Sequence, residues 1–249
     1  MIKYAANSFL ATKISFINEM AAICEKVGAD VTEVARGIGL DPRIGPAFLQ
    51  AGLGWGGSCL PKDVRALSYI ASAQGVRPRI LQAVHETNLY QRRVVVEKLR
   101  QLLGSLSNKT VGLLGLAFKP NSDDMREAPS LDLIHLLLQE GSRLRAYDPM
   151  SMEATARLAP GVALCPDPYQ VAAGSDALVL VTEWEEFREL DMRRMCSLMR
   201  QPYFVDGRNM FHPATMARLG FIYEGIGRGR LGPGEAEALP ALSAVASEP

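Results

Sequence analysis

The sequence lacks an excess of charge of either sign, because its 249 residues hold 27 Lys and Arg against 27 Asp and Glu. No net field therefore recruits nucleic acid or an anionic membrane. It also lacks an apolar run approaching the roughly 18 residues of a membrane span. Its first residues, MIKY, do not build a signal peptide. We therefore expect a cytoplasmic protein that binds neither nucleic acid nor membranes and meets charged ligands with local side chains.

Cysteine and histidine are scarce and are not grouped. The four cysteines form no C-x-x-C pair, and the three histidines lie far from them in the sequence. Neither a metal site nor a disulfide framework is therefore predicted. Cys24, Cys165 and Cys196 stand in apolar or helical contexts, which are typical of buried, unreactive thiols. Cys59 alone has a glycine-rich, polar setting.

The hydrophobic content of 48% supports a substantial core, and the first part of the chain has helical periodicity. Between Ile2 and Val27 apolar residues recur at spacings of three and four, which predicts a helix with one buried stripe. That stripe consists of Ile2, Ala6, Phe9, Ile17, Met20, Ile23 and Val27. No capping residue precedes the helix, so its start looks truncated. Helical patterns return at 30–37, with Asp30 as N-cap, at 64–73 and at 78–103, and residues 1–105 are predicted to be an all-helical central unit.

A polar hinge at 105–109 precedes alternating strands and helices. Strands are predicted at 110–118, 143–149, 162–165, 176–184, 203–209 and 220–227, and helices at 129–141 and 167–174. Continuous apolar strands are typical of a parallel sheet covered on both faces. We therefore predict that the chain is α/β, with residues 106–226 forming a Rossmann-like doubly wound domain. Residues 227–249, rich in Gly, Pro, Ala and Glu, are predicted to be a disordered tail.

The ligand of such a domain lies outside the carboxyl ends of its strands. Those ends carry Phe118, Lys119, Asp148, Pro149, Thr182, Glu183, Asp206, Gly207, Arg208 and Asn209.

The stretch GLGWGGSCLPKD at 52–63 matches two incompatible patterns. Gly52, Gly54 and Gly57 have the G-x-G-x-x-G spacing of a dinucleotide-binding loop. No strand is predicted before them, however, and Pro61 follows too soon for the phosphate-binding helix. The glycines instead indicate close backbone approach to a ligand or to a nucleophile.

Cys59 in this stretch is a candidate nucleophile. Pro61 suits the first turn of a following helix, and a helix N-terminus or a cation such as Lys62 lowers the pKa of a thiol. The alternative is a surface loop with an incidental cysteine, and local chemistry does not choose between the two.

Four separated motifs resemble the UDP-glucose and GDP-mannose dehydrogenase family. They are MIKYAANSFLATKISFINE, GLGWGGSCLPKD, GLAFKPNSDDMREAPS and VDGRN, and the similarity extends from residue 1 to about 229. It covers the family's central helical domain and its nucleotide-sugar-binding domain, and the N-terminal NAD-binding domain is absent. The resemblance implies a homodimer that oxidises a nucleotide sugar from alcohol to acid with NAD. One cysteine adds to the aldehyde, the thiohemiacetal loses hydride to NAD, and water cleaves the thioester.

By position in these motifs, Cys59 resembles the family's nucleophile. Lys3 resembles its active-site lysine and Asn7 the companion asparagine. The spacing of Lys3 and Asn7 places both on one helix face, away from the Ile2, Ala6 and Phe9 stripe. A lysine beside the reacting oxygen would stabilise alkoxide charge. Asp63 resembles the carboxylate that acts as general base on water, and it also suits the first turn of a helix.

The resemblance also implies binding residues in both units. The substrate set is Lys3, Arg43, Phe48, Leu49, Gln50, Ala51, Gly52, Gly56, Phe118, Lys119 and Arg208. Arg43 is similar to an arginine that reaches the substrate of a partner subunit, and Phe118 to a ring stacked on uracil. Lys62 and Arg126 resemble residues that face NAD.

The substrate and the activity have alternatives. GLGWGG resembles the UDP-glucose branch, whose product is UDP-glucuronate, but GDP-mannose or a UDP-N-acetylhexosamine shares the cysteine motif. A different class is a non-catalytic nucleotide-sugar-binding and dimerisation module, with the helix at 78–103 as interface. Because most of the NAD site is missing, we expect these residues to bind a UDP-sugar without reducing NAD. A separate N-terminal NAD-binding domain is then a candidate partner.

Overall fold

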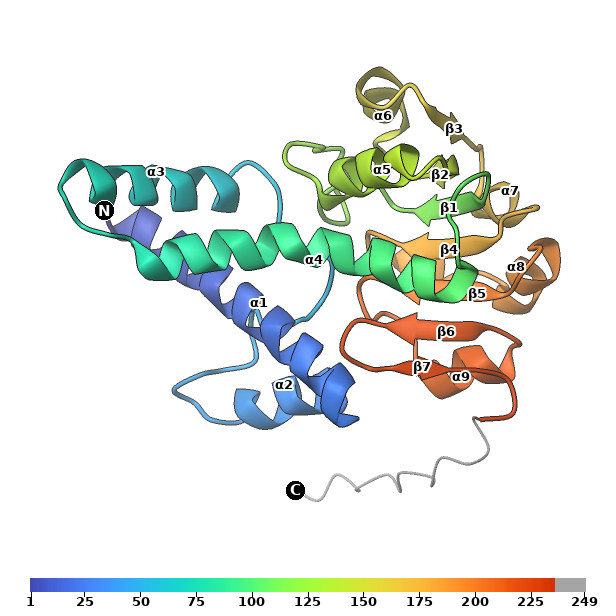
Figure 1. Cartoon of the computed structure of the whole chain (residues 1–249), viewed down its shortest axis with the longest axis horizontal. Helices are drawn as coiled ribbons and strands as arrows, with labels where there is room; N and C mark the ends of the chain where they lie inside the picture. The colour runs from blue at the N-terminus through green and yellow to red at the C-terminus, as the bar shows by residue number, and fades with distance from the viewer. Residues whose placement is uncertain (236–249) are drawn as a thin grey trace.

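The computed structural model describes residues 1–235 of the chain, and they form a helical unit beside an α/β domain (Figure 1). The helical unit contains α1 (Ile2–Val27), α2 (Val31–Gly39), α3 (Leu60–Ala73) and α4 (Arg79–Leu103). α1 packs against α3 and α4, and α4 continues to the sheet, where it contacts β5 and α5. The predicted α/β fold class is confirmed.

The ends of these helices follow local chemistry. Asp30 caps α2 as predicted, since its side chain accepts from the Thr32 backbone N–H. α1 ends at Gly28, whose φ of 73° is a left-handed conformation that glycine adopts without strain. α3 begins at Leu60, four residues before the predicted start, with Pro61 in its first turn and Cys59 at its N-cap position.

The prediction for the buried face of α1 is wrong for most of its residues, although Ile17 is buried as predicted and Met20 packs against the core. Ile2, Phe9 and Val27 are exposed over 89%, 65% and 70% of their surface, and Ile23 is also exposed. The face that packs inward instead contains small residues, which allow α3 and α4 to approach closely. The buried residues of α1 are Ser8, Ala11, Ser15, Ile17, Asn18, Ala21 and Cys24.

Within residues 1–235, seven strands form one sheet in the order β3-β2-β1-β4-β5-β6-β7. They are β1 (Thr110–Leu114), β2 (Arg143–Tyr147), β3 (Val162–Leu164), β4 (Ala177–Leu180), β5 (Tyr203–Asp206), β6 (Ile222–Gly225) and β7 (Arg230–Leu231). β1 to β6 are parallel and β7 is antiparallel to β6. β1 and β4 are buried at every position, as a sheet covered on both faces requires. The strand order reverses between β1 and β4, where open α/β sheets bind ligands.

The helices of this domain cover the sheet (Figure 1). They are α5 (Pro129–Gln139), α6 (Met152–Leu158), α7 (Pro168–Ala172), α8 (Met192–Leu198) and α9 (Pro213–Arg218), with a 3₁₀ turn η1 (Glu185–Glu189). Sequence patterns predict α5 and α7 but miss α6, α8 and α9, which have only six or seven residues each. Helices of this length, like the five-residue α7, do not complete two turns, so periodicity alone does not mark them.

The tail prediction is wrong for its first residues. β7 lies inside the segment assigned to a disordered tail, and Arg230 pairs with Glu224 of β6. The Gly227 N–H also donates to Glu25 Oε1 of α1 at 2.8 Å. These contacts order the segment despite its composition. The rest of the predicted tail, 236–249, lies outside the described residues.

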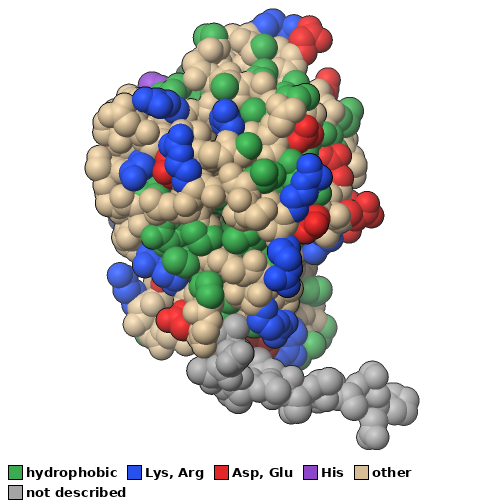
Figure 2. All heavy atoms as spheres, turned by 90° about the vertical axis from the view of Figure 1, so that its right-hand side faces the viewer, with side chains coloured by type: hydrophobic (Ala, Val, Ile, Leu, Met, Phe, Trp, Pro, Cys, Tyr) green, Lys and Arg blue, Asp and Glu red, His purple; other side chains and the backbone are tan. Residues whose placement is uncertain are grey.

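The surface of the α/β domain carries both signs of charge. Figure 2 shows Lys and Arg side chains beside Asp and Glu side chains on this face, with apolar side chains between them. Within residues 1–235, no helix combines the length and apolar character needed to cross a bilayer.

Candidate functional site

The cysteine loop, residues 49–59, lies between the two units and forms hydrogen bonds with both. The Gly52 N–H donates to Asn18 Oδ1 of α1 at 2.8 Å. The Leu53 N–H donates to the Gly207 carbonyl, beyond β5, at 3.0 Å, and the Gly57 N–H to the Arg126 carbonyl at 2.9 Å. The loop therefore crosses the carboxyl edge of the sheet. No strand precedes it, which agrees with the rejection of the dinucleotide pattern.

The glycines of this loop approach protein backbone. A Cβ at Gly56 would lie 2.2 Å from the Glu127 carbonyl oxygen, and one at Gly52 would lie 2.7 Å from the Gly207 oxygen. At Gly57, where φ is 82°, it would lie 2.7 Å from the Phe118 ring. The close approach expected from the sequence is present, but in these contacts its target is the α/β domain. The glycines thus let the cysteine loop seat against the second unit.

Cys59 and Asp63 are presented by the first turn of α3. Cys59 is exposed, and the Asp63 N–H donates to its carbonyl at 2.9 Å. Asp63 has no exposed surface, and its Oδ2 accepts from Asn7 Nδ2 at 2.6 Å. Lys3 Nζ lies 3.9 Å from the same oxygen, and Lys62 Nζ lies 3.8 Å from Oδ1. Four predicted catalytic residues and Lys62 thus gather where α1 and α3 meet.

One oxygen of the Asp63 carboxylate, Oδ1, lies 3.8 Å from Lys62 Nζ but accepts no hydrogen bond from the described residues. This oxygen is buried. A buried acceptor without a partner costs free energy unless a water or ligand group donates to it. Oδ1 is therefore the atom of this cluster that can accept a proton or a hydrogen bond from a bound molecule.

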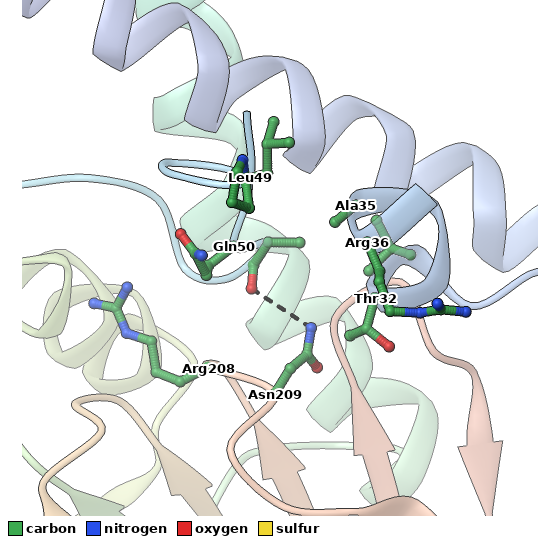
Figure 3. A pocket seen from close by; sticks show the side chains of 10 residues that line it. Thr32, Ala35, Arg36, Leu49, Gln50, Arg208 and Asn209 are labelled. Carbon is green, nitrogen blue, oxygen red and sulfur yellow. Dashed lines mark hydrogen bonds between the residues drawn. The ribbon is translucent and has the colours of Figure 1, made fainter. Parts of the chain in front are cut away.

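A second part of the site is a cavity of about 350 Å³ between α2, the cysteine loop and the segment after β5 (Figure 3). Four of its lining residues are predicted substrate contacts from the two units, Leu49, Gln50, Ala51 and Arg208. Arg208 is held by its Nε, which donates to the Val181 carbonyl at 2.7 Å and lies 3.1 Å from Glu183 Oε2. The cavity is also lined by Val31, Thr32, Ala35, Arg36, Pro46 and Asn209.

The segment after β1 lies against the cysteine loop. The Phe118 ring contacts Gly57, and Lys119 Nζ lies 5.4 Å from the centre of that ring. The guanidinium of Arg126 pairs with Asp124 at 2.7 Å and is exposed to solvent. Two predicted substrate residues and one predicted NAD residue are thus on the side of the loop that faces the α/β domain.

Arg43 and Phe48 stand apart from these clusters. The Arg43 side chain is 87% exposed, and its guanidinium pairs with Asp41 at 2.5 Å. Phe48 is partly exposed and has a φ of 65°, a conformation that is rare for a bulky side chain. Neither residue joins the cluster around Cys59 within this chain.

Asp148 and Asp206, two of the strand-end residues where a ligand was predicted to lie, accept hydrogen bonds from the protein's own backbone. Asp148 accepts from the backbone N–H groups of Leu116 and Ala117 and from Trp184 Nε1. Although burial raises the pKa of Asp148, these backbone bonds lower it below its ordinary value. Asp206 accepts from the Arg208 N–H and the Tyr223 hydroxyl, and burial raises its pKa. These two carboxylates therefore hold the loops at this edge of the sheet.

The family can now be assigned. The chain matches the central domain of the UDP-glucose/GDP-mannose dehydrogenase family over residues 1–90 and its UDP binding domain over residues 112–213. It belongs to that family. The cysteine loop lies in the first matched segment, and Phe118, Lys119 and Arg208 lie in the second.

Relatives named as UDP-glucose dehydrogenases are similar to the chain in sequence and in structure. A UDP-glucose 6-dehydrogenase of Pseudomonas aeruginosa is 51% identical over 95% of this chain and 54% of its own length. UDP-glucose 6-dehydrogenase TuaD of Bacillus subtilis is 50% identical over 92% of this chain and 50% of its own. The structure of a UDP-glucose dehydrogenase from Pyrobaculum islandicum matches with a TM-score of 0.82, at 40% identity, over 91% of this chain and 50% of that one. The chain spans about half the length of the curated relatives it matches.

The two residues predicted to face NAD are exposed cations. Lys62 and Arg126 are exposed on either side of the cysteine loop, and the turn after β1 does not carry the G-x-G-x-x-G pattern. Among the described residues, no three His, Cys, Asp or Glu side chains gather as a metal site.

Alkylation is expected to modify Cys59 before the other thiols. Burial raises the pKa of Cys24, Cys165 and Cys196, so each holds less of the reactive thiolate at neutral pH. Cys59 is exposed. Treatment of the native chain with iodoacetamide, followed by peptide mass mapping, should label Cys59 at least ~10-fold faster than the others. The Cys59→Ser variant should lose the fast phase, and a fast phase on the half-buried Cys196 would contradict the expectation.

Proposed function

We propose that the chain is the catalytic-cysteine and nucleotide-sugar-binding part of an NAD-dependent UDP-glucose 6-dehydrogenase. The observation that carries the proposal is the cluster of Cys59, Asp63, Asn7 and Lys3, which unites residues 56 positions apart in a hydrogen bond. The relatives' names support UDP-glucose as substrate, and its oxidation at C6 to the acid would give UDP-glucuronate. GDP-mannose and UDP-N-acetylhexosamines remain the alternatives, since structures of proteins that act on such sugars also share the fold.

The proposed chemistry divides between the thiol and the carboxylate. The thiolate of Cys59 adds to the C6 aldehyde, forming a C–S bond and an oxyanion that Lys3 and Asn7 stabilise. When bound, one NAD would take the hydride that the C6 alcohol loses in becoming the aldehyde, and a second would take the hydride that the thiohemiacetal loses in becoming the thioester. Asp63 Oδ1, which has no hydrogen-bond partner among the described residues, takes a proton from the water that attacks the thioester carbon. The C–S bond then breaks, which releases the carboxylate product and restores the thiolate.

The nucleotide sugar is proposed to lie along the cysteine loop at the carboxyl edge of the sheet. Leu49, Gln50 and Ala51 and the Gly52 and Gly56 backbone would line it from the helical unit. Arg208 and Lys119 supply positive charge for the diphosphate, and Phe118 an aromatic face for the uracil. On the NAD side, Lys62 and Arg126 are exposed cations.

A homodimer is proposed to form on α1. Ile2, Phe9, Phe16 and Ile23 are exposed at a seven-residue spacing, which lines them up along one face of the helix. The helix at 78–103 supports an interface less well, because its Val84, Val95, Val96 and Leu99 are buried within the chain. An exposed apolar stripe of this kind is typical of an interface between subunits. Arg43, which is exposed and outside the cluster, is proposed to reach a partner's site.

Calorimetry of the purified chain tests the proposal. We expect UDP-glucose to bind at least ~10-fold more tightly than GDP-mannose, a difference of about 1.4 kcal/mol. Alone, the 249 residues should reduce no NAD. Adding the N-terminal half of a relative should restore reduction with wild-type chain and not with Cys59→Ser. Binding without restored activity would favour the non-catalytic module, and absence of binding would overturn both.

A further inference from the structure

Two side chains of α4, Asn88 and Arg92, hold the backbone N–H and C=O of Trp55 in a grip of three hydrogen bonds. Trp55 lies in the middle of the cysteine loop. Its N–H donates to Asn88 Oδ1 at 2.7 Å, and Asn88 Nδ2 donates back to its carbonyl at 3.0 Å. Arg92 Nη2 donates to the same carbonyl at 3.1 Å. Asn88 and Arg92 are four residues apart and therefore share one face of the helix. Three bonds to the backbone groups of one residue hold the peptide units on both sides of the Trp55 Cα.

This grip is shielded from water. Asn88 and Trp55 are 2% and 4% exposed, so solvent does not compete for their hydrogen bonds. A Cβ at Gly54, where φ is 95°, would lie 2.5 Å from Asn88 Oδ1. The Gly54 backbone therefore packs directly against the Asn88 amide, with no room for a side chain between them.

Arg92 extends the grip to the α/β domain. Its Nη1 lies 2.5 Å from Asp132 Oδ2 in the first turn of α5, although only 5% of the Arg92 side chain is exposed. Burial lowers the pKa of Arg92, and the charge of Asp132 acts in the opposite direction. Burying a guanidinium costs free energy that an apolar side chain of similar size would avoid. Arg92 is therefore better explained by the two groups that it joins, the Trp55 carbonyl and the Asp132 carboxylate.

We propose that Asn88 and Arg92 are positioning residues. They hold the backbone N–H and C=O of Trp55 and thereby fix the position of Cys59 relative to the nucleotide sugar. Cys59 follows Trp55 by four residues, and Gly56 and Gly57 between them are already packed against the second unit. Because α4 holds the Trp55 backbone and Cys59 is the N-cap residue of α3, the segment between Trp55 and Cys59 is fixed at both ends. The inference rests on the proposed function of the loop as the substrate-binding segment.

Hydrogen exchange and calorimetry on the full chain test it. In Asn88→Ala and Arg92→Met we expect the amides of residues 52–58 to exchange about 10-fold faster, since one or more buried hydrogen bonds are lost. UDP-glucose should bind about 10-fold more weakly at a temperature where the variants stay folded. Arg92→Lys keeps a cation that reaches the carbonyl and should recover most of the affinity. Arg93→Met, at the exposed neighbouring position, should leave both measurements unchanged.

The outcomes separate the positioning role from the proposed function. Unchanged exchange at 52–58 would overturn the grip, and faster exchange with wild-type affinity would overturn positioning while the function stands. If the wild-type chain fails to bind UDP-glucose, the proposed function fails, and the grip is judged by exchange and by the alkylation rate of Cys59. Should the stronger variants not fold, Asp132→Asn, at a half-exposed site, removes the ion pair alone and should speed loop exchange about threefold. No change there would count against the role of Arg92.

Discussion

Replacing Gly56 with alanine is expected to destabilise the chain and to weaken nucleotide-sugar binding together. The new Cβ would lie 2.2 Å from the Glu127 carbonyl oxygen and 3.0 Å from Pro129 Cδ. Neither neighbour can move easily, because one is backbone and the other is a ring at the start of α5. Overpacking of this kind costs about 1–3 kcal/mol and pushes the loop from its seat. Urea denaturation and calorimetry with UDP-glucose measure the two effects.

Gly37→Ala is the matched control. Gly37 lies within α2, and a Cβ there would meet nothing within 4 Å. Because glycine in an exposed helix is less stable than alanine by about 1 kcal/mol or less, the control should stabilise the chain slightly. Equal urea midpoints for the two variants would show that the contact between the cysteine loop and Glu127 is not close.

Long helices and buried parallel strands were predictable from the sequence. The strand cores and α4 agree with the patterns to within a few residues, because each repeats its period several times. The orientation of α1 was not predictable in the same way. A helix with large apolar residues on one face and small ones on another has two surfaces that can be buried. Here the face with Ala11, Ile17 and Ala21 packs inward, and most of the other large residues remain exposed.

The candidate site divides along similar lines. Motif resemblance identified Cys59, Asp63 and Asn7, and the structure places the last two in hydrogen-bond contact. The residues that hold the loop were missed. Asn18, Asn88 and Arg92 act on backbone groups more than 30 positions away, and no local pattern marks a polar helix residue as an anchor. Such anchors become visible only when the chain's long-range pairing is known.

Lys98→Met is expected to lower the melting temperature by about 10 °C. Lys98 is 4% exposed on α4, and its Nζ lies 2.6 Å from Glu25 Oε1 and 3.0 Å from Glu224 Oε1. Removing one partner of a buried ion pair costs about 3–5 kcal/mol, because the buried Glu224 and the partly buried Glu25 lose the ammonium that lies between them. Each kcal/mol shifts the melting temperature of a chain this size by about 2–4 °C. Thermal unfolding followed by circular dichroism measures the change.

The loss should also free the segment after β6, since this cluster joins three parts of the chain. Glu25 accepts from the Gly227 N–H as well as from Lys98, and Glu224 also pairs with Arg230 of β7. Hydrogen exchange in 226–231 should therefore rise in Lys98→Met. Arg100→Met is the control on the same helix, because Arg100 pairs with Glu140 at a half-exposed site and such pairs contribute little. If both variants melt alike, the buried cluster does not tie α4 to the sheet, and if Lys98→Met alone melts early, it does.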